Sequence, residues 1–229
     1  MTEKEKMEQR RITMEGNPSK PRGEAGRQML ERMNRSHYDM TGWALEKLDV
    51  RPGDSVIDIG CGGGMTVRRL CAMVGNGRVT GIDYSDVSVA SSTQLNAAEI
   101  AAGRAEILAA SVEVLPFADG TFDKAITVES FYFWPDQQEN LREVLRVLKP
   151  GGTLAIVSEI LGDLLPSDRP KGPDMGFEMK IPCLNDYRAM LEAAGFGSVC
   201  MYTQAGKRHV CVLASKDLTA TETAKEGSD

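Results

Sequence analysis

The chain has 229 residues, of which 41% are hydrophobic and 26% charged, a size and composition typical of one globular domain with short extensions. Its formal net charge of −6 excludes a broad basic surface of the kind that binds nucleic-acid phosphates, so a small-molecule substrate is favoured over DNA or RNA. The five cysteines include no C-x-x-C pair, and neither a signal peptide nor an apolar run of bilayer length is recognisable. We therefore expect a cytoplasmic protein that does not associate with a membrane and needs no metal.

The N-terminal part of the chain changes character near residue 24. Residues 1–23 are charged, contain glycines and prolines, and show little periodicity, which predicts a flexible leader or lid. From Glu24 to Leu48 the apolar residues follow a helical stripe, which we expect to break at Gly42 into two helices. Residues 24–50 are therefore predicted to form a helical cap, the first part of a single domain that spans residues 24–216.

The stretch that organises the rest of the chain is VIDIGCGGG, residues 56–64. Val56, Ile57 and Ile59 predict a short buried strand, the glycines predict a sharp turn, and apolar residues at helical spacing from Val67 predict a helix. Glycines let the backbone approach a ligand closely, while the first N–H groups of a helix attract polar or anionic groups. This arrangement predicts a site for a nucleoside-bearing cofactor, with a tight turn that binds nothing as the simpler alternative.

An acidic residue supports the cofactor interpretation. Asp83 ends the next apolar run about 20 residues beyond the loop, where a carboxylate at a strand end can meet ribose hydroxyls. The glycines fall at positions 60, 62 and 64, whereas a dinucleotide-binding fingerprint needs a glycine at the position of Met65. A nicotinamide-dependent oxidoreductase is therefore disfavoured.

The remaining elements are predicted from hydrophobic pattern and turn residues. Strands are expected at residues 78–82, 105–110, 124–128, 153–158, 199–203 and 208–214, and helices at 86–102, 136–148 and 184–194. The proline-rich and glycine-rich residues 161–182 are a candidate substrate lid, and residues 217–229 are expected to be a disordered tail. Arg142, Arg146 and Lys149 are most simply interpreted as a solvated helix face.

Four segments of the chain carry a family resemblance: VIDIGCGGG, GIDYS at 81–85, ASVEVLPFADGTFD at 110–123 and LREVLRVLKPGGTLAI at 141–156. In this order they resemble the motifs of class I S-adenosylmethionine (SAM)-dependent methyltransferases, in the broad group related to the ubiquinone and menaquinone C-methylases. The resemblance covers roughly residues 40–215. It implies an α/β, Rossmann-like, doubly wound seven-stranded sheet, mostly parallel with one antiparallel C-terminal strand, and helices on both faces. It also implies SAM as cofactor and S-adenosylhomocysteine as product.

The resemblance also implies a set of cofactor-binding residues: Asp58, Gly60, Cys61, Gly62, Asp83, Tyr84, Ser111, Val112 and Glu129. Gly60, Cys61 and Gly62 would pass along the methionine and ribose parts of SAM, with Asp58 bracing the loop or reaching the methionine amine. Asp83 would bind the ribose hydroxyls, and Tyr84 would lie against the adenine.

The third motif departs from the family pattern. Ser111 stands where many relatives have an acidic residue that contacts the adenine amino group, so this contact is expected to be weakened. Val112 would still offer its backbone N–H to a ring nitrogen. Glu129, at the end of the fourth strand, would face the methionine end of the cofactor and the acceptor.

Methyl transfer from a sulfonium mainly requires that the nucleophile is held in line with the C–S bond and that water is excluded. If the acceptor must lose a proton, His37, Glu129 and Tyr132 are the candidate groups. Each has a simpler interpretation: a hydrogen-bonded histidine on the helical stripe, a carboxylate on the cofactor amine, and a ring that lines the pocket. The other histidine, His209, is predicted to be structural.

The leading hypothesis is a SAM-dependent methyltransferase that moves the methyl group to a nucleophilic atom of a small-molecule acceptor. The alternative is a non-catalytic SAM-binding regulatory or scaffold protein, which Ser111 slightly favours. Methylation of nucleic acid is disfavoured because residues 129–132 read ESFY in place of an N/D-P-P-Y/F motif. The sequence leaves open the acceptor atom and the choice between a monomer and a homodimer.

Overall fold

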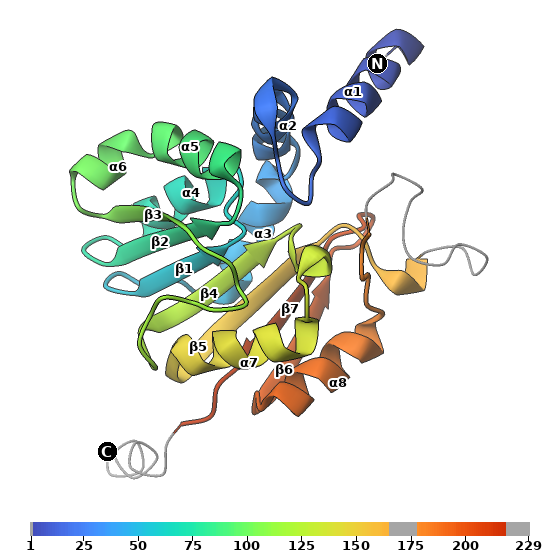
Figure 1. The fold of residues 1–229 in the computed structure, drawn as a ribbon. Coiled ribbons are helices and arrows are strands. Elements are labelled where there is room, and N and C mark those ends of the chain that lie inside the picture. Colours follow the sequence, from blue (N-terminus) through green and yellow to red (C-terminus); the bar gives the residue numbers. More distant parts are fainter. Residues whose placement is uncertain (1, 165–177, 219–229) are drawn as a thin grey trace.

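The computed structural model of the protein describes residues 2–164 and 178–218. Residues 165–177 of the candidate lid and residues 219–229 of the predicted tail lie outside the described residues. Seven strands form one sheet in the order β3-β2-β1-β4-β5-β7-β6 (Figure 1). Their bounds are β1 Ser55–Ile59, β2 Arg78–Asp83, β3 Ala105–Ala109, β4 Phe122–Val128, β5 Leu148–Ser158, β6 Ser198–Thr203 and β7 Val210–Ser215.

The neighbouring strands from β3 to β5 are parallel, whereas β7 runs antiparallel to both of its neighbours, β5 and β6. Helices cover both faces of the sheet (Figure 1). The predicted fold class, a doubly wound Rossmann-like sheet with one antiparallel C-terminal strand, is therefore confirmed. The strand order reverses between β1 and β4, and in open α/β sheets a ligand crevice lies at such a point, beyond the carboxyl ends of the strands.

The helices are α1 Glu3–Gly16, α2 Gly23–Ser36, α3 Tyr38–Leu48, α4 Met65–Met73, α5 Asp86–Leu95, α6 Ala97–Ala101, α7 Gln137–Val147 and α8 Leu184–Ala194, with short 3₁₀ turns η1 Phe131–Phe133 and η2 Gly162–Leu164. Two hydrophobic clusters form the core, one on each side of the sheet. Val56 and Ile57 are consecutive in β1, so their side chains point to opposite faces. Val56 packs in the cluster with α3 and α4, and Ile57 in the cluster with α7 and α8.

Residues 3–16 were expected to belong to an irregular leader, but they form the helix α1. Thr2 and Glu5 make a capping box at its start, a signal that the composition of the segment concealed. Arg11 pairs with Glu8 and Glu15 on the exposed side of the helix. Arg32 of α2 donates to the Thr13 hydroxyl at 2.7 Å. Helix α1 is thus stabilised by local ion pairs and by contact with α2.

Two helix boundaries also differ from the prediction. The cap helices break at His37 and not at Gly42, which lies within α3 and packs against Arg69. The single helix expected over residues 86–102 is divided at Asn96 into α5 and α6. The Asn96 side chain donates to the Ser92 carbonyl at 2.9 Å, a bond of the kind by which asparagine competes with helical hydrogen bonding.

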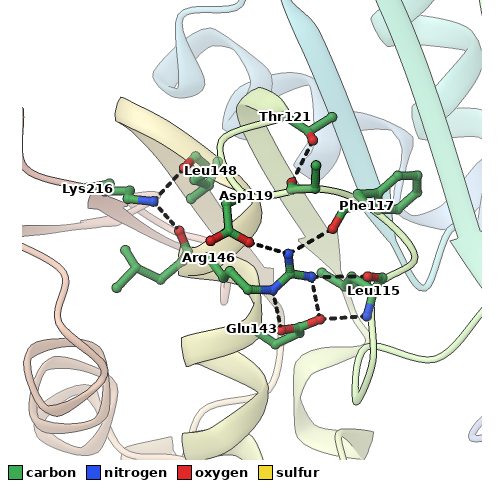
Figure 2. Close-up of polar contacts among 10 residues, drawn as sticks. Leu115, Phe117, Asp119, Thr121, Glu143, Arg146, Leu148 and Lys216 are labelled. Carbon is green, nitrogen blue, oxygen red and sulfur yellow. Dashed lines mark hydrogen bonds and ion pairs between the residues drawn. The ribbon is translucent and has the colours of Figure 1, made fainter.

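Arg146, in the last turn of α7, holds the loop that follows β3 (Figure 2). Its guanidinium donates to the carbonyls of Leu115 and Phe117 at 3.1 and 2.8 Å. It also binds Asp119 at 2.7 Å and makes two bonds of 2.8 Å to Glu143. All five N–H donors of the guanidinium are therefore used. The expectation that Arg146 belongs to a solvated face is wrong, because this residue fixes the loop that begins with Ser111 and Val112.

Replacing Arg146 by alanine is expected to lower the free energy of unfolding by about 1–3 kcal/mol, since the loop carbonyls lose charged donors. The matched control is Arg142→Ala on the same helix, whose side chain pairs with the exposed Glu139. It should change the free energy by less than about 0.5 kcal/mol. Urea unfolding followed by circular dichroism measures both variants, and equal losses would contradict a specific role for Arg146.

Candidate functional site

All of the sequence-predicted site residues line one cavity at the carboxyl ends of β1, β2 and β4. They are His37, Asp58, Gly60, Cys61, Gly62, Asp83, Tyr84, Ser111, Val112, Glu129 and Tyr132. With its open mouth the cavity contains about 1270 Å³ of empty space. Part of this space is open to solvent, so the site is a cleft and not an enclosed cavity.

The glycine turn between β1 and α4 is fixed to β2. The backbone N–H groups of Gly60 and Cys61 both donate to the Ile82 carbonyl at 2.9 Å. Gly60 has φ +75°, and a Cβ at this position would lie 2.6 Å from the hydroxyl of Ser130. Only glycine adopts this conformation and leaves the space that Ser130 occupies. The turn therefore presents bare backbone to the cleft.

Asp58, at the end of β1, is 1% exposed, and its Oδ2 has no hydrogen-bond partner among the described residues. Burial, together with the nearby negative charge of Asp83, raises the pKa of Asp58 to about 8. An unpaired carboxylate in such a place destabilises the folded protein and offers a strong interaction to a cationic or donor group.

The pKa of Asp58 predicts an unusual pH dependence of stability. Its folded-state pKa of about 8 lies above the value of ~3.9 for an unfolded aspartate, so its contribution is full below ~3.9 and is lost as the pH rises through about 8. Asp58→Asn, which cannot ionise, should therefore gain stability relative to the natural protein between pH 5 and pH 8.5. Thermal unfolding of both proteins at these two pH values measures the effect. A stability difference that is the same at both values would contradict it.

Asp83 ends β2, and its carboxylate accepts hydrogen bonds both from the glycine turn and from the residue that precedes α5. Its Oδ2 accepts from Gly62 N–H at 3.0 Å, and its Oδ1 accepts from Ser85 N–H at 2.9 Å. Burial raises the pKa of Asp83, although these bonds act in the opposite direction. Burial likewise raises the pKa of the Cys61 thiol well above its usual range, so this cysteine is an uncharged part of the wall.

Tyr84 faces the segment between α1 and α2, which belongs to the stretch predicted to be a flexible leader or lid. Its hydroxyl donates to the Ser19 carbonyl, and Lys20 Nζ lies 5.2 Å from the ring centroid. Ser85 donates to the Pro21 carbonyl at 2.6 Å. The segment from Pro18 to Pro21 therefore contributes to the cavity lining beside the end of β2.

Ser111 and Glu113, in the loop after β3, also line the cavity. The Ser111 hydroxyl donates to Glu113 Oε2 at 2.9 Å and accepts from the Glu113 N–H at 3.3 Å. An acidic side chain, Glu113, is therefore present two residues after the position at which many relatives carry one. Sequence reasoning missed Glu113 because the motif was matched position by position.

Glu129 is the residue after β4 and has the left-handed value φ +53°, which is uncommon for a residue other than glycine. Its Oε2 accepts from the Tyr132 hydroxyl at 2.9 Å, and its Oε1 accepts from the Glu159 N–H. Burial raises the pKa of Glu129, and the electrostatic interaction with His37 acts to lower it. Burial also raises the pKa of Tyr132, whose hydroxyl therefore remains protonated.

The aromatic run after Glu129 serves both the core and the cavity. Phe131 is buried against Trp134 and Tyr187, with ring centroids 4.9 and 5.5 Å apart. Tyr132, Phe133 and Trp134 line the cavity. Phe131 thus belongs to the core, whereas the three residues that follow it contribute to the cavity wall.

The structure adds polar residues that the sequence did not identify. Asn34 of α2 donates to the Gly63 carbonyl at 3.0 Å, so the cap contacts the glycine turn directly. Ser88, Ser92 and Asn96 are buried on the side of α5 that faces the turn. Serines at helical spacing give no hydrophobic periodicity, so pattern analysis had no signal for this contact.

Within residues 2–164 and 178–218, no cluster of three or more histidine, cysteine, aspartate or glutamate side chains has the arrangement of a metal site. None of the helices in this part of the chain combines the length and apolar character that crossing a bilayer requires.

Residues 57–156 match the model of a family described as a methyltransferase domain. The chain is 24% identical over 189 residues to the uncharacterized methyltransferase YdaC of Bacillus subtilis, covering 82% of this chain and 97% of that one. It is 32% identical over 157 residues to the 27-O-demethylrifamycin SV methyltransferase of Amycolatopsis mediterranei, covering 65% of this chain but only 56% of that one.

A SAM-dependent methyltransferase from Aquifex aeolicus shares the fold, with a TM-score of 0.64, 21% identity, and coverage of 82% of this chain and 97% of that chain. The fold, the cleft at the strand reversal and the family match lead to one conclusion: the protein belongs to the class I SAM-dependent methyltransferases.

Proposed function

We propose that the half of the cleft beside β1 and β2 binds SAM and that the half between α2 and η1 binds a small-molecule acceptor. The observation that carries this proposal is the set of three carboxylates, Asp58, Asp83 and Glu129, whose pKa values are raised by burial around the glycine turn. A ligand with a positive charge favours the ionised forms of such groups. SAM, when bound, supplies a methyl group that its sulfonium charge already activates.

The chain's own groups fit such a cofactor. The glycine turn admits a ligand against the backbone, and the unpaired Asp58 carboxylate suits a cationic amine. Asp83, Tyr84 and Val112 line the same cavity, and Asp83 would accept hydrogen bonds from the ribose hydroxyls. We assign these residues to cofactor binding.

The acceptor half of the cleft is largely apolar. Met33 of α2, Phe133 and Trp134 contribute apolar lining, while Glu129, His37 and Tyr132 supply polar groups. This lining favours an acceptor with an apolar body and one nucleophilic atom that carries a proton, such as a hydroxyl. The relative described as a 27-O-demethylrifamycin SV methyltransferase supports a small-molecule acceptor.

Glu129 is the group we assign to accept the proton of that atom. Its backbone places the carboxylate at the cavity wall, and the Tyr132 hydroxyl and the Glu159 N–H hold the two oxygens in place. Burial brings its pKa closer to neutrality, where a general base is most effective. His37, at the junction of α2 and α3, lines the same wall and steadies the ionised carboxylate.

The proposed function is tested in two stages. Titration calorimetry with S-adenosylhomocysteine should show one site per chain. Incubation with methyl-labelled SAM and a panel of apolar hydroxyl, amine and thiol compounds should then give a labelled product. No binding of SAM or S-adenosylhomocysteine would overturn the proposal, and binding without product over the whole panel would favour the non-catalytic SAM-binding alternative.

Glu129→Gln should separate catalysis from binding. Loss of a general base is expected to lower the transfer rate by about 10²–10⁴-fold, while the dissociation constant for S-adenosylhomocysteine changes by less than about tenfold. In the natural protein the rate should fall as the pH drops through the raised pKa of Glu129, and this dependence should disappear in the variant. Glu139→Gln, at an exposed position on α7, is the control. A variant that loses binding and rate equally would instead make Glu129 a cofactor ligand.

A further inference from the structure

The face that helix α5 turns toward the core is polar. Ser88, Ser92 and Asn96 follow one another at four-residue spacing, and their side chains are 0%, 0% and 1% exposed. Helices that cover a sheet ordinarily bury an apolar stripe, because burying polar groups costs free energy unless they are hydrogen-bonded. Such a stripe needs a partner for its hydrogen bonds, and the Ser92 hydroxyl and the Asn96 amide nitrogen have one, whereas Asn96 Oδ1 and the Ser88 hydroxyl have none among the described residues.

That partner is the glycine turn. Asn96 Nδ2 donates to the Gly64 carbonyl at 3.0 Å, and the same nitrogen donates to the Ser92 carbonyl at 2.9 Å. At the other end of the turn the Cys61 thiol donates to the Ser92 hydroxyl at 3.7 Å. Helix α5 thus binds the turn near its first and its last residue.

Packing reinforces these bonds. Gly64 has φ +80°, and a Cβ at this position would lie 2.6 Å from Asn96 Nδ2 and would also collide with Ser92. The backbone of the turn is therefore in direct contact with the helix. Ser88, one turn before Ser92, lines the cavity with a hydroxyl that has no partner among the described residues.

We infer that Asn96 and Ser92 are positioning residues for the cofactor loop: they touch no part of the cleft themselves but hold Cys61 and Gly64 so that the turn keeps its shape against the ligand. This inference rests on the function proposed above, in which the turn carries SAM. It also explains why the predicted helix over residues 86–102 breaks at Asn96, since the side chain bonds to the turn and to the Ser92 carbonyl.

The test uses Asn96→Asp, which keeps the size of the side chain but removes the N–H donor, and Ser92→Ala as a milder second variant. Asn96→Asp should weaken binding of S-adenosylhomocysteine, measured by titration calorimetry, about tenfold or more, equivalent to ~1.4 kcal/mol. The control is Asn140→Ala: Asn140 is as buried as Asn96 and accepts from the Asp136 N–H at 3.2 Å on α7. It should lower the melting temperature without changing the affinity.

A second readout needs no ligand. In the free protein, the amide chemical shifts of Gly62, Gly63 and Gly64 should move, and their hydrogen exchange should accelerate, in Asn96→Asp and less so in Ser92→Ala, but not in Asn140→Ala. If the natural protein failed to bind S-adenosylhomocysteine, the proposed function would fall, while these amide signals would still decide the role of Asn96. Unchanged glycine amides in Asn96→Asp, or an equal loss of affinity in Asn140→Ala, would overturn the inference.

Discussion

The cleft depends on a backbone turn that is enclosed on three sides by other parts of the chain. A side chain at Gly60 would meet Ser130 after β4, one at Gly63 would meet Asn34 of α2, and one at Gly64 would meet Ser92 of α5. Because every one of these contacts is against a polar group, the turn is held by hydrogen bonds as well as by packing. The side of the turn that faces the cavity is the one left open, so the same residues that fix the loop also define where a ligand can lie.

The electrostatics of the cleft follow from that geometry. The turn brings Asp58 and Asp83 to adjacent strand ends, and Glu129 joins them from β4, so three acidic side chains become buried around one cavity. Two of them are hydrogen-bonded by the protein, whereas Asp58 Oδ2 has no partner among the residues that the structure describes. Burial of this kind destabilises the free protein and is relieved by a cation. In the function proposed above, a positively charged ligand offsets this cost when it binds.

The central part of this fold was predictable from sequence, because strand, glycine turn and Asp83 follow rules that act within a few residues. Helix α8 and the β6–β7 hairpin were also found at nearly their observed positions, since apolar spacing and turn glycines mark them locally. Helix α1 and the break at Asn96 were missed for a different reason. Helix α1 is stabilised by a capping box and ion pairs in a segment without apolar periodicity. The break at Asn96 is stabilised by a hydrogen bond to Gly64, which is 32 residues away in the sequence. The role of Arg146 was hidden likewise, because its partners at 115–119 are distant in sequence.

Glu129 combines the constraints that distinguish a functional position from a structural one. A non-glycine residue at φ +53° costs on the order of 1–3 kcal/mol, and glycine at this point would remove that cost. Burial of the carboxylate adds a second cost, which the bonds from Tyr132 and Glu159 only partly offset, because the pKa of Glu129 remains raised. The Glu129 side chain is not part of the hydrophobic core, whose contacts in this region come from Phe131 and Trp134. This combination of strain, burial and a position at the cavity wall supports the role in proton transfer that we propose for Glu129.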